Sequence, residues 1–291
     1  MPTVAKARER RWAWVLAASA VIVSGFLPAA RGQENVPKGG PAASDKEGAN
    51  RRIVERWKRE MAEYTIVMRT EPETVLRLRA EPALHWTNPI RESDNGLVFL
   101  WLADNRPAAI VCFYRSPWQG RILESHEFHS LAPVGLIATR GGQKIWAPSG
   151  AGIIFRPIPG AEKPAGTPAE RLRQLRGLAR EFKGVVDPDK GKTELRLLSQ
   201  PLFRYESGQS ASLDGAIFAF VLTTDPEAVV VIEERAGAAG QDWHYAFAKM
   251  TNHSLAMRLG DKVVWEVPPD RDYYTDSTRP YFVRWDEAPA P

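Results

Sequence analysis

A short run of chemically active side chains lies near the centre of the sequence, His126-Glu127-Phe128-His129. Two imidazoles and a carboxylate are ligand types that Zn²⁺ favours, so His126 and His129 are the candidate metal ligands. On a strand, however, side chains alternate between the two faces, and both imidazoles reach one metal only if the segment is bulged or helical. The default expectation is therefore a half-buried His126 and a surface His129.

No other residue pattern in the sequence indicates catalysis. His85, His244 and His253 have no nucleophile or partner carboxylate at a recognisable spacing, and no serine-hydrolase, zinc-protease, phosphate-binding or dinucleotide motif is present. Cys112, the one cysteine, lies in an apolar run and is expected to be a small buried residue. We therefore expect no cofactor, and the sequence favours a protein that is not an enzyme.

Aromatic residues supply the candidate ligand-binding side chains. The chain has ten Trp, and aromatic rings are typical of ligand-binding surfaces. Trp118 lies in a short polar loop and is a candidate exposed contact; Trp101 and Phe220 are the other candidates. The segment 270–286 is rich in Tyr, Trp and Arg, a composition typical of interfaces, although a final strand packed back across the body is the simpler interpretation.

The sequence pattern of the elements that would position these residues occurs twice in the chain. At an offset of 119 residues, positions 76–146 align without a gap to 195–265 and give 14 identities, where chance gives about four or five at ordinary residue frequencies. Trp101 falls on Phe220, and Gly96 falls on Gly215. This pattern indicates a tandem duplication.

Each copy is predicted to begin with a helix and to continue as strands. Thr167 and Pro168 are typical of a helix start, and apolar residues at helical spacing follow as far as Phe182. In the first copy the same spacing recurs at Val54, Trp57, Met61 and Tyr64. Short links between the later apolar runs suit antiparallel hairpins. The central runs 97–102 and 108–114 are apolar on both faces, so the other copy's sheet or a long loop must cover the second face.

These observations predict an α+β fold. Each copy would be one helix followed by a meander-like antiparallel sheet, and the two copies would form a pseudo-twofold body. In layout alone this is similar to cystatin-like modules and to periplasmic lipoprotein carriers. The predicted segments are a signal peptide at 1–32, a disordered linker at 33–48, the first copy at 49–160, a linker at 161–168, the second copy at 169–286 and a disordered tail at 287–291.

The N-terminus predicts export. A basic stretch precedes an apolar run from 12 to 27, which is short for a membrane span, and small residues follow at 30 and 32. Residues 1–32 carry five of the 39 basic and one of the 35 acidic residues, which leaves 34 of each in the mature chain. A neutral mature chain argues against nucleic-acid binding. We expect a periplasmic or extracellular protein with no stable membrane span after cleavage.

The sequence also resembles a family of uncharacterised exported bacterial proteins. The resemblance is carried by residues 82–89, 106–107, 126–131, 171–182, 197–206 and 214–215. These are mostly apolar and turn residues, so the resemblance implies export and implies no particular chemistry.

Three functions remain open from the sequence. The first is an exported non-enzymatic binding or accessory protein, which would hold a small apolar ligand or a partner protein between the two copies or between helix and sheet. The second is a periplasmic carrier of lipids or other hydrophobic molecules. The third is a metal-dependent hydrolase that uses His126 and His129.

Overall fold

The computed structural model describes residues 43–88, 93–187, 191, 193–206, 214–237 and 240–288. The predicted signal peptide, residues 33–42 of the predicted linker and residues 289–291 of the predicted tail lie outside this part of the chain. Within it the protein is mostly β, with 55% strand, 12% helix and two helices, arranged as large antiparallel sheets and a half-barrel. The predicted α+β fold of helix-then-sheet repeats is therefore wrong.

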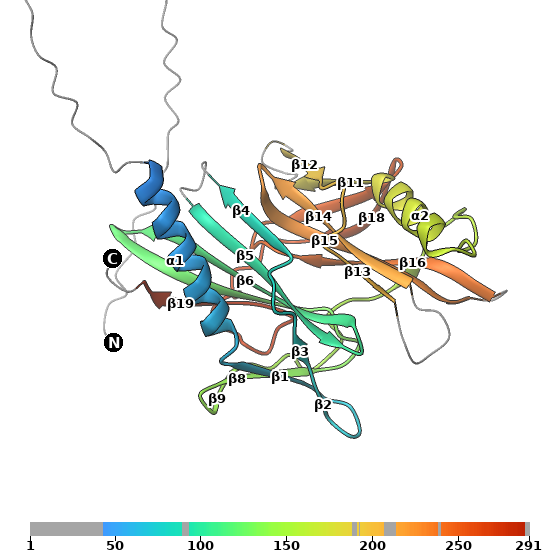
Figure 1. The fold of residues 1–291 in the computed structure, drawn as a ribbon. Helices are drawn as coiled ribbons and strands as arrows, with labels where there is room; N and C mark the ends of the chain where they lie inside the picture. Colours follow the sequence, from blue (N-terminus) through green and yellow to red (C-terminus); the bar gives the residue numbers. More distant parts are fainter. Residues whose placement is uncertain are drawn as a thin grey trace, which may run out of the picture. The chain divides into compact units, whose positions relative to one another are not determined.

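We call residues 43–155 the first half and residues 156–288 the second half. The first half contains one helix and nine strands among its described residues (Figure 1). They are α1 (Ala43–Met61), β1 (Tyr64–Met68), β2 (Thr74–Val75), β3 (Arg77–Leu78), β4 (Leu84–Asn88), β5 (Ser93–Ala103), β6 (Arg106–Trp118), β7 (Arg121–Ser130), β8 (Leu136–Arg140) and β9 (Gln143–Trp146). Helix α1 thus includes residues 43–48, which the sequence placed in a disordered linker.

The second half follows a related order. Its described elements are β10 (Arg156–Pro157), α2 (Pro168–Arg180), β11 (Phe182–Val186), β12 (Thr193–Leu197), β13 (Phe203–Glu206), β14 (Asp214–Leu222), β15 (Asp225–Gly237), β16 (Gly240–Lys249), β17 (Leu255–Leu259), β18 (Lys262–Val267) and β19 (Tyr281–Glu287). Thr167 is the N-cap of α2, as predicted, and its side chain accepts a hydrogen bond from the backbone N–H of Glu170.

The fold is more β-rich than predicted because both predicted helices end earlier. Tyr64 and Phe182 continue the helical spacing of apolar residues, but each is the first residue of a strand, β1 and β11. Both strands alternate buried and more exposed side chains, which is the period of a strand. Each pairs with a later strand, β8 or β17. The two strands therefore enlarge the sheets at the expense of helix.

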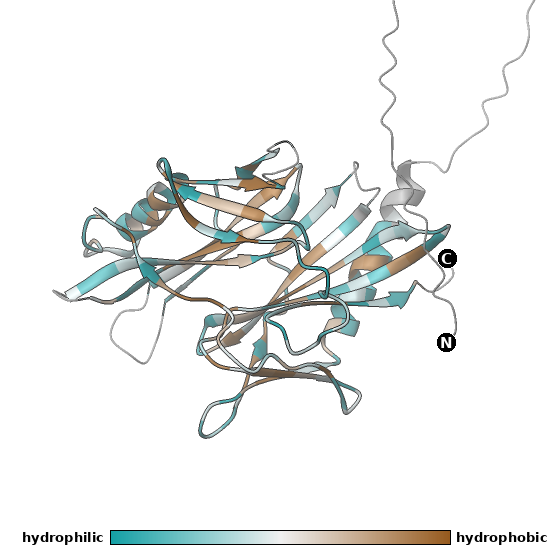
Figure 2. Cartoon of the chain, turned by 180° about the vertical axis from the view of Figure 1, so that it is seen from behind, coloured by the Kyte–Doolittle hydropathy of each residue, from teal (hydrophilic) through white to brown (hydrophobic). Residues whose placement is uncertain are grey.

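The described strands form three antiparallel sheets. A four-stranded sheet has the order β2-β1-β8-β9, and a six-stranded sheet has the order β19-β7-β6-β5-β3 with β4 also paired to β5. The third sheet has nine strands in the order β10-β16-β15-β14-β12-β11-β17-β18, with β13 also paired to β14. Hydrophobic stretches run along the long strands (Figure 2).

Three apolar clusters follow from these sheets. One packs Trp57 and Met61 of α1 on β5 and β6, and the second packs Leu175 of α2 on β14 to β16. The third joins the two halves through the opposite faces of the same strands, for example Val98 with Ile217. The central strands are therefore buried on both faces, and residues of the other half's sheet belong to the cluster on the second face.

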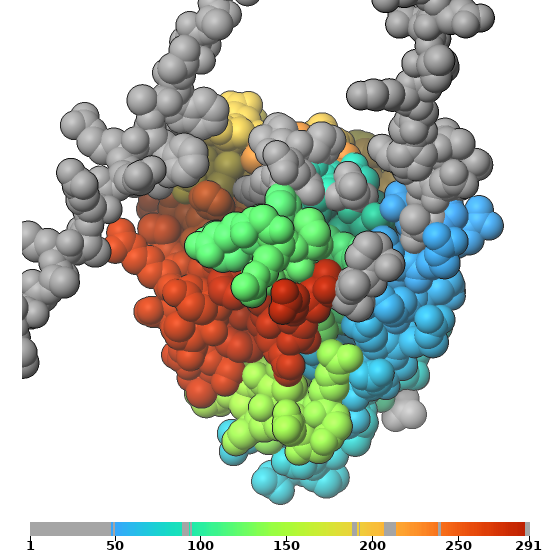
Figure 3. Space-filling model, turned by 90° about the vertical axis from the view of Figure 1, so that its left-hand side faces the viewer, coloured from blue at the N-terminus to red at the C-terminus, as the bar shows by residue number. Residues whose placement is uncertain are grey.

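The second half also contributes one strand to the first half's sheet, whereas β10 stays in the sheet of its own half. Strand β10 pairs with β16, and the C-terminal strand β19 pairs with β7 over all seven of its residues. Figure 3 shows the C-terminal segment in red against the green β6–β7 region. The segment 270–286 thus includes a final strand, which was the simpler interpretation of its sequence.

No helix in the described part of the chain is long and apolar enough to span a membrane.

Candidate functional site

The two histidines of the predicted metal motif lie on opposite faces of β7. His126 shares its face with Phe128 and stacks against Phe113, with the ring centroids 3.9 Å apart. His129 lies on the other face, where its Nδ1 is 2.7 Å from the carbonyl oxygen of Lys249. Strand alternation therefore keeps the two imidazoles apart, and the described residues contain no cluster of three or more potential metal-ligating side chains.

Both histidines are more buried than expected. Each is 1% exposed, so the expectation of a half-buried His126 and a surface His129 is wrong. Strand β19 covers the edge of β7 beside them: Arg284 pairs with His126 and Tyr281 pairs with His129. The sequence pattern of β7 alone did not show this cover.

His126 is held as a neutral imidazole. Burial is the main cause that lowers its pKa from 6.5 to about 4, and the nearby Asp286 carboxylate opposes that shift. The Tyr64 hydroxyl lies 2.6 Å from Nδ1. Because burial raises the pKa of that phenol to about 12, the hydroxyl stays protonated. It donates a hydrogen bond to Nδ1 of His126.

This burial predicts a loss of stability in acid. Below pH 6.5 the unfolded chain protonates His126 while the folded chain does not, so the free energy of unfolding falls as the pH drops from 6.5 towards 4. The full contribution is about 3 kcal/mol, the pKa difference converted at about 1.4 kcal/mol per pH unit. Chemical denaturation of the wild type and of His126→Gln at pH 7, 5.5 and 4 measures it.

The stability difference between wild type and His126→Gln should shrink or reverse towards pH 4. His85→Gln is the matched control, since His85 is exposed, and its difference from wild type should change much less. A difference for His126→Gln that stays constant from pH 7 to pH 4 would contradict the buried neutral imidazole.

The structure does not bring the three candidate ligand-binding residues together. Trp101 and Phe220 are fully buried in the apolar clusters beneath α1 and α2. Trp118 is 60% exposed at the end of β6. None of the three lines the cavity between the two halves, so the aromatic residues predicted from the sequence are core residues in two cases and an exposed surface residue in the third.

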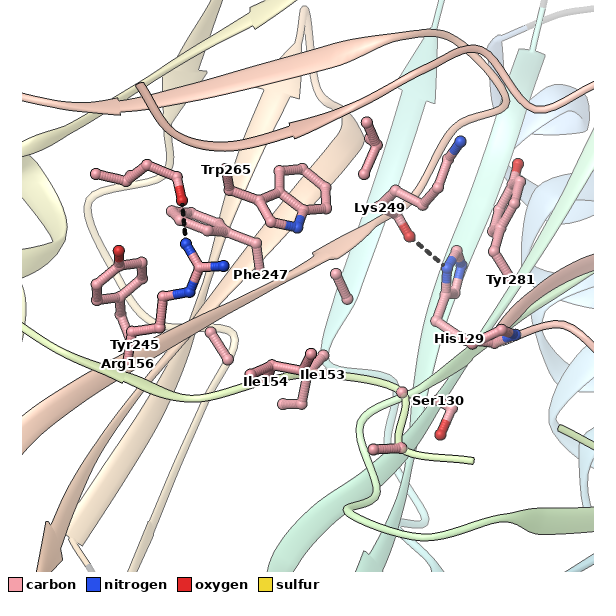
Figure 4. Close-up of a pocket in the computed structure, with 17 residues that line it drawn as sticks. His129, Ser130, Ile153, Ile154, Arg156, Tyr245, Phe247, Lys249, Trp265 and Tyr281 are labelled. Carbon is pink, nitrogen blue, oxygen red and sulfur yellow. Dashed lines mark hydrogen bonds between the residues drawn. The ribbon is translucent and has the colours of Figure 1, made fainter. Parts of the chain in front are cut away.

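This cavity between the two halves has a volume of about 310 Å³, and we call it the Lys249 cleft (Figure 4). It runs along the edge of β16, and the end of β7, the segment before β10, β18 and the start of β19 enclose it. Its lining residues are His129, Ser130, Ala151, Gly152, Ile153, Ile154, Arg156, Tyr245, Ala246, Phe247, Ala248, Lys249, Val264, Trp265, Val267, Pro280 and Tyr281.

The cleft exists because β16 loses its outer partner part-way along. Strand β10 pairs only with His244 and Tyr245 of β16. Among the described strands none pairs with that edge from Ala246 to Lys249. Side chains from the other half line the space beside this free edge, which is how residues far apart in the sequence meet there.

Most of the cleft wall is apolar. Phe247 and Trp265 stack with centroids 5.5 Å apart and ring planes 30° apart. Ile153 and Ile154 also line the cleft, and Ile154 is 74% exposed. Exposed apolar residues beside an aromatic wall are typical of a site that binds an apolar or aromatic group.

Lys249 gives the cleft a positive charge. Burial is the main cause that lowers the pKa of its ammonium group, and Asp270 opposes the shift. The ammonium nitrogen lies 5.2 Å from the centroid of the Tyr281 ring, a cation–π contact. In the described part of the chain no side chain forms an ion pair or hydrogen bond with this nitrogen, so it is available to an anion.

Two further polar atoms at the same end, Nε2 of His129 and the Ser130 hydroxyl oxygen, are buried. The carbonyl oxygen of Lys249 accepts a hydrogen bond from Nδ1 of His129, and Nε2 of the same ring lies 3.8 Å from Oε2 of Glu127. Within the described residues, Nε2 and the Ser130 hydroxyl are buried without a hydrogen bond. Arg156 also lines the cleft and donates to the carbonyl of Val264 at 2.9 Å. The cleft thus combines an apolar wall with a cationic, hydrogen-bonding end.

The sequence did not single out Lys249. It ends the strand Gly240–Lys249, which is aromatic and apolar in its second part. A lone Lys at the end of such a strand, where Ser130 stands 119 residues earlier in the sequence, was the available signal. Strand β19 and the segment before β10 reach the cleft through pairing between distant parts of the chain. The local spacing of residue types does not predict that pairing.

No family model, no curated protein and no solved structure matches this chain. The chemistry of the site therefore has to be argued from its geometry.

Proposed function

We propose that the protein is an exported, non-enzymatic binding protein that holds a small anionic molecule with an aromatic or apolar body in the Lys249 cleft. The observation that carries this proposal is the half-buried Lys249 ammonium without an ion-pair partner among the described residues, at the end of a cleft lined by Phe247 and Trp265. A carboxylate or similar anion on Lys249 would place the apolar body of the ligand against the two rings.

The size of the cleft favours a small ligand. Its volume of about 310 Å³ is at the lower end of the roughly 300–1,000 Å³ typical of small-molecule sites. This supports a molecule of one or two rings over a lipid with two acyl chains. The lipid-carrier alternative predicts a copurified lipid, and a native mass spectrum of the protein purified under mild conditions tests it.

Export and an internal repeat are part of the same proposal. Strands β6 to β9 begin at 106, 121, 136 and 143, and strands β15 to β18 begin at 225, 240, 255 and 262, each 119 residues later. This constant offset supports an internal repeat. The basic and apolar N-terminal segment and the resemblance to exported proteins support an export signal.

A set of three probes with one shape and different charges tests the proposal. We expect 2-naphthoate to bind at least tenfold more tightly than 2-naphthalenemethanol, and 2-naphthylmethylamine to bind most weakly. A charged hydrogen bond contributes about 1.5–3 kcal/mol, which is roughly a tenfold to hundredfold difference in affinity. Isothermal titration calorimetry at neutral pH gives the three dissociation constants.

Lys249→Met should reduce the affinity for 2-naphthoate at least tenfold and bring it close to that of the alcohol. Lys262→Met is the matched control, because Lys262 is exposed at the start of β18 and does not line the cleft. Equal binding of the acid and the alcohol to the wild type, or unchanged 2-naphthoate binding in Lys249→Met, would refute the proposal.

A further inference from the structure

A second cavity, of about 210 Å³, lies beyond Tyr281 and has the opposite charge. We call it the Glu127 cavity. The residues that matter here are two carboxylates, Glu127 and Asp225, and four aromatic side chains, Trp86, Tyr114, Tyr273 and Tyr281. Tyr281 lines both cavities. None of the described residues that line the Glu127 cavity is Lys or Arg.

Glu127 is a buried carboxylate with unused acceptor capacity. Its side chain is 7% exposed, and Oε1 accepts a hydrogen bond of 2.7 Å from the Tyr281 hydroxyl. Oε2 accepts no hydrogen bond from any described residue, and Nε2 of His129 is 3.8 Å away. One neutral donor compensates little of the cost of burying a carboxylate, so this position favours a cation.

The aromatic side chains give the cavity walls that suit an organic cation. The Trp86 and Tyr114 rings lie 5.7 Å apart, and Tyr273 stacks on Tyr281 at 6.2 Å. Burial raises the pKa values of the Tyr114, Tyr273 and Tyr281 hydroxyls, so these rings stay neutral at physiological pH. Neutral aromatic rings attract cations through their faces and cover apolar groups.

The neighbouring charges agree with this assignment. Asp225 adds a second carboxylate, one oxygen of which accepts a 2.9 Å hydrogen bond from the Asn88 amide. The Lys249 ammonium is stacked on Tyr281 and lines the other cavity. An anion would meet the buried Glu127 carboxylate in this cavity, whereas a cation would meet Oε2 of Glu127 and the faces of the aromatic rings.

We propose that the Glu127 cavity is a second binding site, which takes a small organic ammonium ion. The ammonium group would donate to Oε2 of Glu127, and its apolar part would pack against Trp86, Tyr114 and Tyr273. The site is separate from the Lys249 cleft and prefers ligands of the opposite charge.

Fluorine NMR on the full chain tests this proposal with 4-fluorobenzylamine, 4-fluorobenzyl alcohol and 4-fluorobenzoate, one probe at a time. The amine is expected to give saturable line broadening and to bind at least tenfold more tightly than the alcohol. An excess of 2-naphthoate should leave the bound amine in place, since it occupies the other cavity. Equal binding of the amine and the alcohol, or displacement of the amine by 2-naphthoate, would overturn the proposal.

Glu127→Gln removes the charge and keeps an oxygen that accepts from Tyr281. It should weaken 4-fluorobenzylamine binding at least tenfold and leave 2-naphthoate binding within twofold. Glu266→Gln, at an exposed position of β18, is the matched control and should change neither. Unchanged amine binding in Glu127→Gln would refute the site even if the Lys249 cleft binds 2-naphthoate as proposed.

Tyr273→Leu provides a second test that does not depend on the buried carboxylate. Tyr273 is partly exposed, and leucine keeps apolar bulk while it removes the ring face. The amine should bind at least threefold more weakly, and the preference for amine over alcohol should remain because Glu127 is intact. An unchanged affinity for the amine would show that the aromatic wall does not contact it.

Discussion

A chain that ends at Pro280, and so lacks only residues 281–291, is expected to unfold at a much lower temperature than the full chain. Tyr281, Phe282 and Val283 of β19 are all buried. The loss of three buried side chains of this size costs about 6 kcal/mol at roughly 2 kcal/mol each. In a protein of this size that loss lowers the melting temperature by about 15 °C.

Removal of β19 has two further effects besides the loss of three buried side chains. Without β19 the outer edge of β7 is unpaired from Leu123 to His129, and such an edge promotes aggregation. Glu127 also loses the hydroxyl of Tyr281, its one hydrogen-bond donor among the described residues. Aggregation of the shortened chain on expression would agree with the same prediction.

Differential scanning calorimetry compares this chain with one that ends at Ala288, which keeps β19 intact. The chain that ends at Ala288 should have a melting temperature within a few degrees of that of the full chain. If the chain that ends at Pro280 also melts there, β19 contributes little and the account of how the two halves are joined is incorrect.

Gly152→Ala is expected to destabilise the protein strongly, although it adds only one methyl group to the wall of the Lys249 cleft. A Cβ at Gly152 would lie 2.1 Å from the carbonyl oxygen of Ser130 and 2.4 Å from its carbonyl carbon. These are backbone atoms of β7, so the clash is relieved only if the segment before β10 moves away. Overpacking of this kind costs about 3 kcal/mol.

The same displacement should weaken ligand binding. The segment 151–156 supplies Ile153 and Ile154 to the cleft wall, and Gly152 donates its backbone N–H to Ala132 at 2.9 Å. We expect the affinity for 2-naphthoate to fall about threefold to tenfold in a protein that still folds, since a gap of about 1 Å at this wall removes up to about half of its dispersion attraction to the ligand.

Gly150→Ala is the matched control two residues away, because a Cβ there meets nothing within 4 Å. Denaturant titration and calorimetry on both variants check stability and binding. Equal stability of the two variants would contradict the close approach of this segment to β7.

The sequence predicted the long central strands well. Short links and apolar residues on both faces predicted strands at 97–102 and 108–114, which overlap β5 and β6. The same patterns misjudged the fold class, because Tyr64 and Phe182 satisfy helical spacing and strand alternation at once. Pairing with β8 and β17 decides the conformation of these residues, and that pairing is not a local property.

The candidate site was harder to predict for a related reason. A pattern of residue types does not distinguish Trp101 and Phe220, which are buried in cores, from aromatic residues that line a cleft. Lys249, Ile153 and Tyr281 meet because β16 has a free edge and because β19 crosses to the sheet of the first half. Residue spacing along the chain predicts which side chains share a face of one strand. This site instead depends on how several strands pack together.

The ligand that we propose for the Lys249 cleft is an anionic aromatic molecule. The most direct test is a crystal structure of the protein with 6-bromo-2-naphthoate, in which the anomalous signal of bromine locates the ligand. We predict the naphthalene ring against Phe247 and Trp265 and the carboxylate within hydrogen-bond distance of the Lys249 ammonium. A bromine signal elsewhere on the protein, with the cleft free of ligand, would contradict the claim.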